Sequence, residues 1–96
     1  MRTIVIDGSA FDTMSGFYDE AERKFTSGLT WKIGRNLDAF NDVLRGGFGV
    51  HAYGEPIVIR WLCAGKSRGD LGCMFDSIVE IINDKEDHNC TLEFVD

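Results

Sequence analysis

Three segments of the chain have patterns of apolar residues that are typical of strands. Residues 3–7 (TIVID) are β-branched and apolar and are followed by Gly8, which is typical of a first strand. Residues 90–95 (CTLEFV) alternate between apolar and polar side chains, as a last strand would. Residues 56–62 (PIVIRWL) form a nearly unbroken apolar run, which predicts a central parallel strand covered on both faces, with Trp61 in the core.

Three further segments have the spacing of three to four residues that is typical of amphipathic helices. The first runs to Phe25, with Ser15 as its expected N-cap. The second covers residues 37–45, with Asn36 as N-cap, and its apolar side chains fall on one side of the helix. The third covers residues 71–84 and carries acidic side chains opposite its apolar face.

The order of these elements predicts an α/β fold. Residues 65–69 are polar and are expected to form a turn, so the order is strand, helix, helix, strand, helix, strand. Helical crossovers between successive strands imply a three-stranded parallel sheet flanked by α-helices. The length of 96 residues is that of a single domain, residues 1–96. No segment has the 18 or more apolar residues of a membrane helix, and the N-terminus does not resemble a signal peptide, so we expect a cytoplasmic protein.

The formal net charge of −6 is unevenly distributed along the chain. Residues 70–96 contain eight acids and one base, which leaves the rest of the chain close to neutral. An acidic surface repels the phosphates of nucleic acids and of anionic membranes, so we expect neither as a partner. A basic protein is the favoured partner instead.

Motifs for thiol chemistry and nucleotide binding are weak. Cys63, Cys73 and Cys90 lack the two-residue spacing of zinc or redox motifs, and we expect them to be buried free thiols. Residues 47–52 fit the glycine spacing of a dinucleotide-binding loop, but they follow a predicted helix rather than a strand. The sequence therefore predicts no cofactor.

A metal site or a catalytic centre has little more support. Glu86, Asp87, His88 and Cys90 lie within five residues, but three or four ligands must converge to hold a metal ion. Polar surface residues at a helix end are the commoner explanation, and His88 is favourable there near the C-terminal dipole. No nucleophile lies beside a recognisable base and orienting group, so we expect no enzymatic activity.

The outer face of the helix at residues 37–45 carries two acids one turn apart, Asp38 and Asp42. Like charges at this spacing cost an isolated helix about 0.2–0.5 kcal/mol per pair, and Arg35 and Arg45 are placed to relieve that repulsion. Two interpretations remain open. The face is either simply solvated or a docking surface for a positively charged partner.

A second row of acids, Asp76, Glu80 and Asp84, is spaced by four residues along the third predicted helix. No Lys or Arg lies three or four residues from Asp76 or Glu80, so a cationic partner would relieve their repulsion. Three aromatic residues expected in loops either anchor an interface or fold back over the core. These residues are Trp31, Phe48 and Tyr53.

Residues 33–46 (IGRNLDAFNDVLRG) resemble the signature helix of the barstar family, intracellular inhibitors of an extracellular ribonuclease, at seven positions of fixed spacing. The segments IDG, EPIVIRW and SIVEIINDKEDHNC also occur in the order expected for this family, so the resemblance covers nearly the whole chain. It implies a barstar-like fold, with a three-stranded parallel sheet flanked by helices, and no enzymatic activity.

The resemblance also implies a mode of binding, in which the second helix and the loop before it close the active site of the nuclease. Asp42 matches the acid that occupies the phosphate subsite, and Asp38 matches a second acid that reaches a basic residue at the rim. Gly34 matches a glycine that lets the backbone approach the partner. Asp84 matches an acid on the last helix that meets a partner arginine.

The chain departs from the family pattern mainly at aromatic positions. Asn41 stands where the family has a tryptophan, and residues 32–33 stand where it has two tyrosines, with Trp31 one or two positions out of register. The loop after the second helix is longer, and Phe48 or Tyr53 would replace a tryptophan there. These departures bear on the identity of the target more than on the mode of binding.

The resulting hypothesis is an inhibitor that is monomeric when free and binds a small basic, extracellular-type ribonuclease in a 1:1 complex, without cofactor or metal. The alternative is a barstar-fold immunity or adaptor protein with a partner that is not a ribonuclease. A small enzyme or metal protein would depend on the cluster at residues 86–90 alone. The candidate partner-binding residues are Trp31, Gly34, Asp38, Asn41, Asp42, Arg45, Phe48, Glu80 and Asp84.

Overall fold

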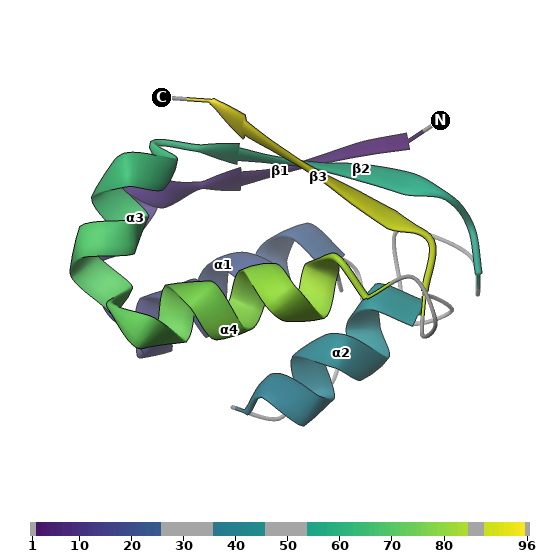
Figure 1. The fold of residues 1–96 in the computed structure, drawn as a ribbon, viewed down its shortest axis with the longest axis horizontal. Coiled ribbons are helices and arrows are strands. Elements are labelled where there is room, and N and C mark those ends of the chain that lie inside the picture. The colour runs from purple at the N-terminus through teal and green to yellow at the C-terminus, as the bar shows by residue number, and fades with distance from the viewer. Residues whose placement is uncertain (1, 26–35, 46–53, 85–87, 96) are drawn as a thin grey trace.

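The computed structural model describes residues 2–25, 36–45, 54–84 and 88–95 (Figure 1). The elements, in chain order, are β1 (Arg2–Asp7), the short 3-10 helix η1 (Gly8–Ala10), α1 (Met14–Phe25), α2 (Leu37–Arg45), β2 (Ile57–Leu62), α3 (Ala64–Leu71), α4 (Cys73–Ile82) and β3 (Cys90–Val95). All three predicted strands and the three predicted helices are present. α3 is an additional helix.

The three strands form one parallel sheet in the order β1-β2-β3. Ile4 pairs with Ile59, and Ile59 pairs with Leu92, so one inward-facing row crosses the whole sheet. This architecture confirms the predicted α/β class with a three-stranded parallel sheet flanked by helices.

The helices α1, α2 and α4 lie on the same side of the sheet, and α3 lies at the end toward which β1 and β2 run (Figure 1). Strand order explains this arrangement, because two right-handed crossovers that each advance one strand in the same direction place their helices on one face. The prediction that β2 is covered on both faces is therefore wrong. Arg60 is exposed and Val58 is only half-buried on the face that no described helix covers.

Aromatic rings hold the helices against the covered face of the sheet. Trp61 of β2 stacks on Phe17 of α1 with ring centroids 5.6 Å apart, and it meets Phe75 of α4 edge-on at 5.1 Å. Phe40 of α2 meets Phe17 edge-on, also at 5.1 Å. All four side chains are at most 1% exposed, which confirms that Trp61 lies in the core.

Side-chain caps fix where α1 and α2 begin. Thr13 Oγ1 accepts a hydrogen bond from the Gly16 N–H at 3.1 Å, so α1 is capped by Thr13 and the prediction of Ser15 is wrong. The sequence alone does not distinguish Thr13 from Ser15, because each has a hydroxyl group that can cap a helix. Asn36 Oδ1 accepts from the Ala39 N–H at 2.8 Å, which confirms the predicted cap of α2.

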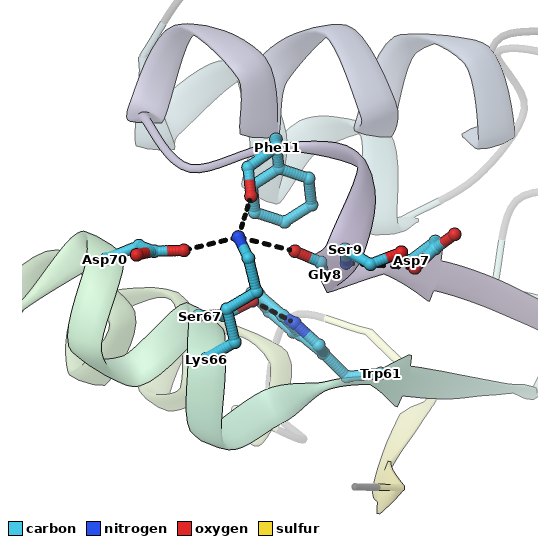
Figure 2. A network of polar contacts seen from close by, with 8 residues as sticks. All are labelled: Asp7, Gly8, Ser9, Phe11, Trp61, Lys66, Ser67 and Asp70. Atoms are coloured by element: carbon cyan, nitrogen blue, oxygen red, sulfur yellow. Dashed lines mark hydrogen bonds and ion pairs between the residues drawn. The ribbon is translucent and has the colours of Figure 1, made fainter.

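Residues 65–69, which are predicted to form a turn, belong to helix α3, so this prediction is wrong. Its buried residues, Ala64, Ser67 and Leu71, have helical spacing, but two of them are too small to give a hydrophobic pattern. Ser67 Oγ accepts a hydrogen bond from Trp61 Nε1 at 2.9 Å, and Lys66 Nζ donates to the carbonyl of Phe11 at 2.8 Å (Figure 2). These tertiary hydrogen bonds thus stabilise α3, although its sequence has only a weak hydrophobic pattern.

Gly8 allows η1 to approach α3 closely (Figure 2). A Cβ atom at this position would lie 2.5 Å from the carbonyl oxygen of Leu62 and 2.5 Å from Ser67 Oγ. The carbonyl of Gly8 also accepts a hydrogen bond from Lys66 Nζ at 3.3 Å. A side chain at Gly8 would therefore separate the ends of β1 and β2 from α3.

The three cysteines are free, as expected, but their burial differs. Cys90 is buried and Cys63 is half-buried, whereas Cys73 is exposed, so the prediction that all three are buried is wrong. Cys73 is the first residue of α4 and follows Gly72 at an exposed junction between two helices. Within the described ranges, no helix has both the length and the apolar character needed to cross a membrane.

Candidate functional site

The candidate site is the outward face of α2, and the inward face of that helix determines its direction. Phe40, Val43 and Leu44 are at most 3% exposed, and Phe40 contacts the rings of both Phe17 and Phe25. Three buried side chains on one stripe of a nine-residue helix fix its rotation about its axis. The acids on the opposite side of the helix, Asp38 and Asp42, therefore point to solvent.

Asp38 and Asp42 are both exposed on this outward face. The side chain of Asp42 retains 58% of its accessible surface, and its Oδ1 lies 3.3 Å from Arg45 Nη1. Within the described residues, the carboxylate of Asp38 has neither a hydrogen bond nor an ion pair. Arg35, the residue expected to relieve Asp38, lies outside the described ranges. The face thus carries one paired and one locally unpaired carboxylate.

The same charges also suit the helix itself. Asp38 lies in the first turn of α2 and Arg45 in the last, where an acid and a base interact favourably with the helix dipole. Each such interaction contributes about 0.3–1 kcal/mol at an exposed position. A purely solvated face therefore remains a sufficient explanation of these residues taken alone.

The second row of acids lies on the neighbouring helix, because α2 and α4 pack against each other (Figure 1). Asp76, Glu80 and Asp84 are all exposed. The prediction that Asp84 is helical is wrong: α4 ends at Ile82, and Asn83 is its C-cap. The Asp84 N–H still donates to the Ile81 carbonyl at 3.2 Å, which keeps this acid close to the end of α4.

The C-terminal ends of α2 and α4 are joined to the start of β3. Cys90 Sγ lies 3.5 Å from the carbonyl oxygen of Leu44, within reach of a weak S–H···O hydrogen bond. His88 Nε2 lies 2.7 Å from the carbonyl oxygen of Ile81, and its Nδ1 accepts from the Cys90 N–H at 3.3 Å. The Cys90 contact thus attaches the last turn of α2, which bears Arg45, to β3, and the His88 contacts attach the end of α4 to the same strand.

His88 was expected to be a surface residue, and this prediction is wrong. The side chain is only 4% exposed because both ring nitrogens bind main-chain groups at the end of α4 and the start of β3. Glu86 and Asp87 lie outside the described residues. Within the described part of the chain, no group of three or more His, Cys, Asp or Glu side chains is placed to hold a metal ion.

The remaining candidate binding residues from the sequence differ in whether the structure describes them. Asn41 is described and is half-buried on α2. Trp31, Gly34 and Phe48 lie outside the described ranges, as does Tyr53. The structure therefore brings together Asp38, Asp42 and Arg45 on one helix, with Glu80 on the helix beside it.

A second polar region, which the sequence pattern did not predict, lies at the carboxyl ends of β1 and β2 (Figure 2). Asp7 accepts hydrogen bonds from the hydroxyl and the N–H of Ser9, and these bonds hold the pKa of Asp7 below its ordinary value. Glu20 is 2% exposed, accepts from the Asp7 N–H at 2.8 Å and pairs with Arg23. The one sequence signal of this region was the glycine that directly follows β1.

Burial affects one further ionisable group in this layer. Tyr18 is 7% exposed, and desolvation raises the pKa of its hydroxyl. Its ring meets Phe17 edge-on at 5.7 Å. Tyr18 is thus a core residue of α1 and not part of the α2 face.

Comparison with known families identifies the fold. The family model described as barstar (barnase inhibitor) matches residues 1–94 of the 96-residue chain. The protein therefore belongs to the barstar family, whose members are inhibitors rather than enzymes. No curated protein sequence gives a significant match.

Proposed function

We propose that residues 1–96 form a single cytoplasmic domain that binds a small, basic, extracellular-type ribonuclease in a 1:1 complex and blocks its active site. The observation that carries this proposal is the outward direction of Asp38 and Asp42 on α2, which the buried Phe40 enforces. Family membership supports the class of target, because the family is described as barnase inhibitors.

The chemistry of the proposed contact is that of a phosphate mimic. A ribonuclease binds the phosphate of RNA with cationic groups, and a carboxylate accepts charge-assisted hydrogen bonds from the same groups. We assign this role to Asp42 and a rim contact to Asp38. An exposed carboxylate suits this role, because exchanging its hydrogen-bond partners leaves the packing of the core unchanged.

Neighbouring residues would extend the contact. Glu80 and Asp84 lie on the side of α4 and at its end, and each would meet a cation at the edge of the target. Asn41 would contribute a polar contact between the two aspartates. Gly34 would let the backbone come close, and Trp31 or Phe48 would supply an aromatic anchor.

A second candidate function is that of an immunity or adaptor protein whose partner is not a ribonuclease. The observation that favours it is Asn41, a half-buried amide on α2 where the family pattern has a tryptophan. Large aromatic side chains are enriched at protein interfaces, so their replacement changes the surface offered to a partner.

An inhibition assay separates the two candidates. The purified chain is titrated against a panel of small basic microbial ribonucleases that includes barnase, with RNA cleavage as the readout. The proposal expects full inhibition of at least one of them at a molar ratio of one. No inhibition of any enzyme in the panel would favour the second candidate.

Matched variants test whether α2 carries the effect. Asp42→Asn removes one charge from the proposed site, and Asp12→Asn removes one from an exposed position just before α1. We expect inhibition to weaken for Asp42→Asn and to stay unchanged for Asp12→Asn. Equal losses would indicate a general effect of net charge instead of a phosphate mimic.

A further inference from the structure

The outward face of α2 carries a cation beside its acids. Arg45 Nη1 lies 3.3 Å from Asp42 Oδ1, and the two side chains retain 39% and 58% of their accessible surface. We propose that Arg45 competes intramolecularly for Asp42, so that a cationic partner binds this carboxylate only by displacing or opposing Arg45. This inference rests on the proposed function, and it concerns the regulation of affinity at the same site.

Geometry places Arg45 in competition for one of the two carboxylate oxygens of Asp42. A cationic nitrogen binds a carboxylate oxygen at about 3 Å, so one that reaches the Asp42 oxygen held by Arg45 comes within about 6 Å of the Arg45 guanidinium. Two like charges at that distance repel each other more strongly once an interface excludes water. The partner therefore meets both a competitor for Asp42 and a like charge.

The backbone of Arg45 does not move aside easily. Its carbonyl oxygen accepts a hydrogen bond from the Gly54 N–H at 2.7 Å, and the preceding residue, Leu44, is 1% exposed. Release of Asp42 therefore depends on rotation of the Arg45 side chain. An exposed pair three residues apart is weak enough for such rotation to occur in water.

The test measures the dissociation constant for barnase, the probe, with four variants of the full chain. These are Arg45→Gln, Asp42→Asn, the double variant, and Arg60→Gln as a charge control. Arg60 pairs with Glu93 on the face of the sheet that no described helix covers, and its side chain is 46% exposed. It matches Arg45 in charge and exposure but not in position.

We expect Arg45→Gln to bind barnase about threefold to tenfold more tightly, because it removes both a weak competitor and a like charge. Arg60→Gln should stay within about twofold of the parent chain. The gain from Arg45→Gln should largely disappear in the Asp42→Asn background. Unchanged or weaker binding by Arg45→Gln would overturn the inference, as would an equal gain from Arg60→Gln.

The outcomes separate this inference from the proposed function. If the parent chain binds and Asp42→Asn weakens binding, but Arg45→Gln gives no gain, only the competitor role fails. If the parent chain does not bind barnase, or Asp42→Asn binds as well as the parent, the phosphate-mimic function fails for this probe and the competitor role fails with it.

A measurement on the free protein checks the internal contact without any partner. Urea unfolding of the parent, the two single variants and the double variant forms a cycle for the Asp42–Arg45 pair. We expect the pair to change the unfolding equilibrium constant by about twofold beyond the product of the two single effects. Strict additivity of the two substitutions would contradict the competitor role.

Discussion

Phe40 and Asp42 point to opposite sides of α2: the ring of Phe40 is fully buried, and the carboxylate of Asp42 is exposed. The two residues are separated by two positions, or about 200° around a helix, so the burial of one directs the other to solvent. The direction of the proposed phosphate mimic is thus a consequence of core packing.

The two acids of α2 should differ in their effect on binding. We predict that Asp42→Ala weakens inhibition of the target ribonuclease by about 1.5–3 kcal/mol, the range for hydrogen bonds to charged groups. Asp38→Ala should cost at most about 1 kcal/mol, as for an exposed ion pair. Inhibition constants measured at one ionic strength test this, and equal losses or no losses would remove the phosphate-mimic mechanism.

The same two substitutions should hardly change stability, because both side chains are exposed. We expect the free energy of unfolding to change by less than about 0.5 kcal/mol in each case. Thermal or urea unfolding of each variant provides the control for the binding experiment. A large loss of stability would mean that reduced inhibition reflects unfolding and not a lost contact.

Gly8→Ala should destabilise the fold. A Cβ atom would lie 2.5 Å from both the Leu62 carbonyl oxygen and Ser67 Oγ, so we predict a loss of about 1–3 kcal/mol in urea unfolding. Gly69→Ala is the matched control at an exposed position of α3, because its Cβ atom would meet nothing within 4 Å. The control should be neutral or stabilising by up to about 1 kcal/mol, since alanine favours helix more than glycine does. Equal effects at both positions would contradict the close approach at Gly8.

The cap of α2 should contribute to the stability of the fold. Asn36→Ala removes the acceptor of the Ala39 N–H, and we predict a loss of about 0.5–2 kcal/mol in unfolding free energy. Asn36→Asp keeps an acceptor and adds a favourable negative charge at the helix N-terminus, so it should retain parent stability. If the Asp variant were as unstable as the Ala variant, the capping role of Asn36 would be wrong.

Asp7 should make stability sensitive to acid. The Ser9 side-chain hydroxyl, followed by its backbone N–H, lowers the pKa of Asp7 in the folded state from its ordinary value of 3.8. Since the folded pKa is the lower one, the stabilisation is present above about pH 3.8 and is lost as pH falls through the folded pKa. Urea unfolding of the parent and of Asp7→Asn should therefore differ near neutral pH and converge in acid. A difference that grows in acid would contradict this assignment.

Strands and amphipathic helices were predictable because their buried side chains are large and regularly spaced. The helix α3 was not, because Ala64 and Ser67 pack by small size and by hydrogen bonding rather than by hydrophobic pattern. The burial of His88 was also missed, because its two partners are main-chain groups that no side-chain pattern reveals. The strand order could not be derived from the sequence. This order places the crossover helices on one face of the sheet, so that no described helix covers the other face.

The candidate site was predictable in part. The exposure of Asp38 and Asp42 followed from the spacing of apolar residues on α2, and the structure places both on the outward face. The expectation that Arg45 relieves the repulsion on this face is confirmed by its contact with Asp42. The corresponding expectation for Arg35 and Asp38 stays a prediction, because Arg35 lies outside the described residues. The aromatic anchors Trp31 and Phe48 stay predictions.

The most direct test of the central claim is whether the protein and a mononucleotide occupy the same site of the target. A ribonuclease that the chain inhibits is mixed with increasing concentrations of a 3′-mononucleotide that binds its active site, and the apparent dissociation constant of the chain is measured at each concentration. If Asp42 takes the position of an RNA phosphate, that constant increases in proportion to nucleotide concentration without reaching a plateau. An apparent dissociation constant that does not respond to the nucleotide would contradict the account.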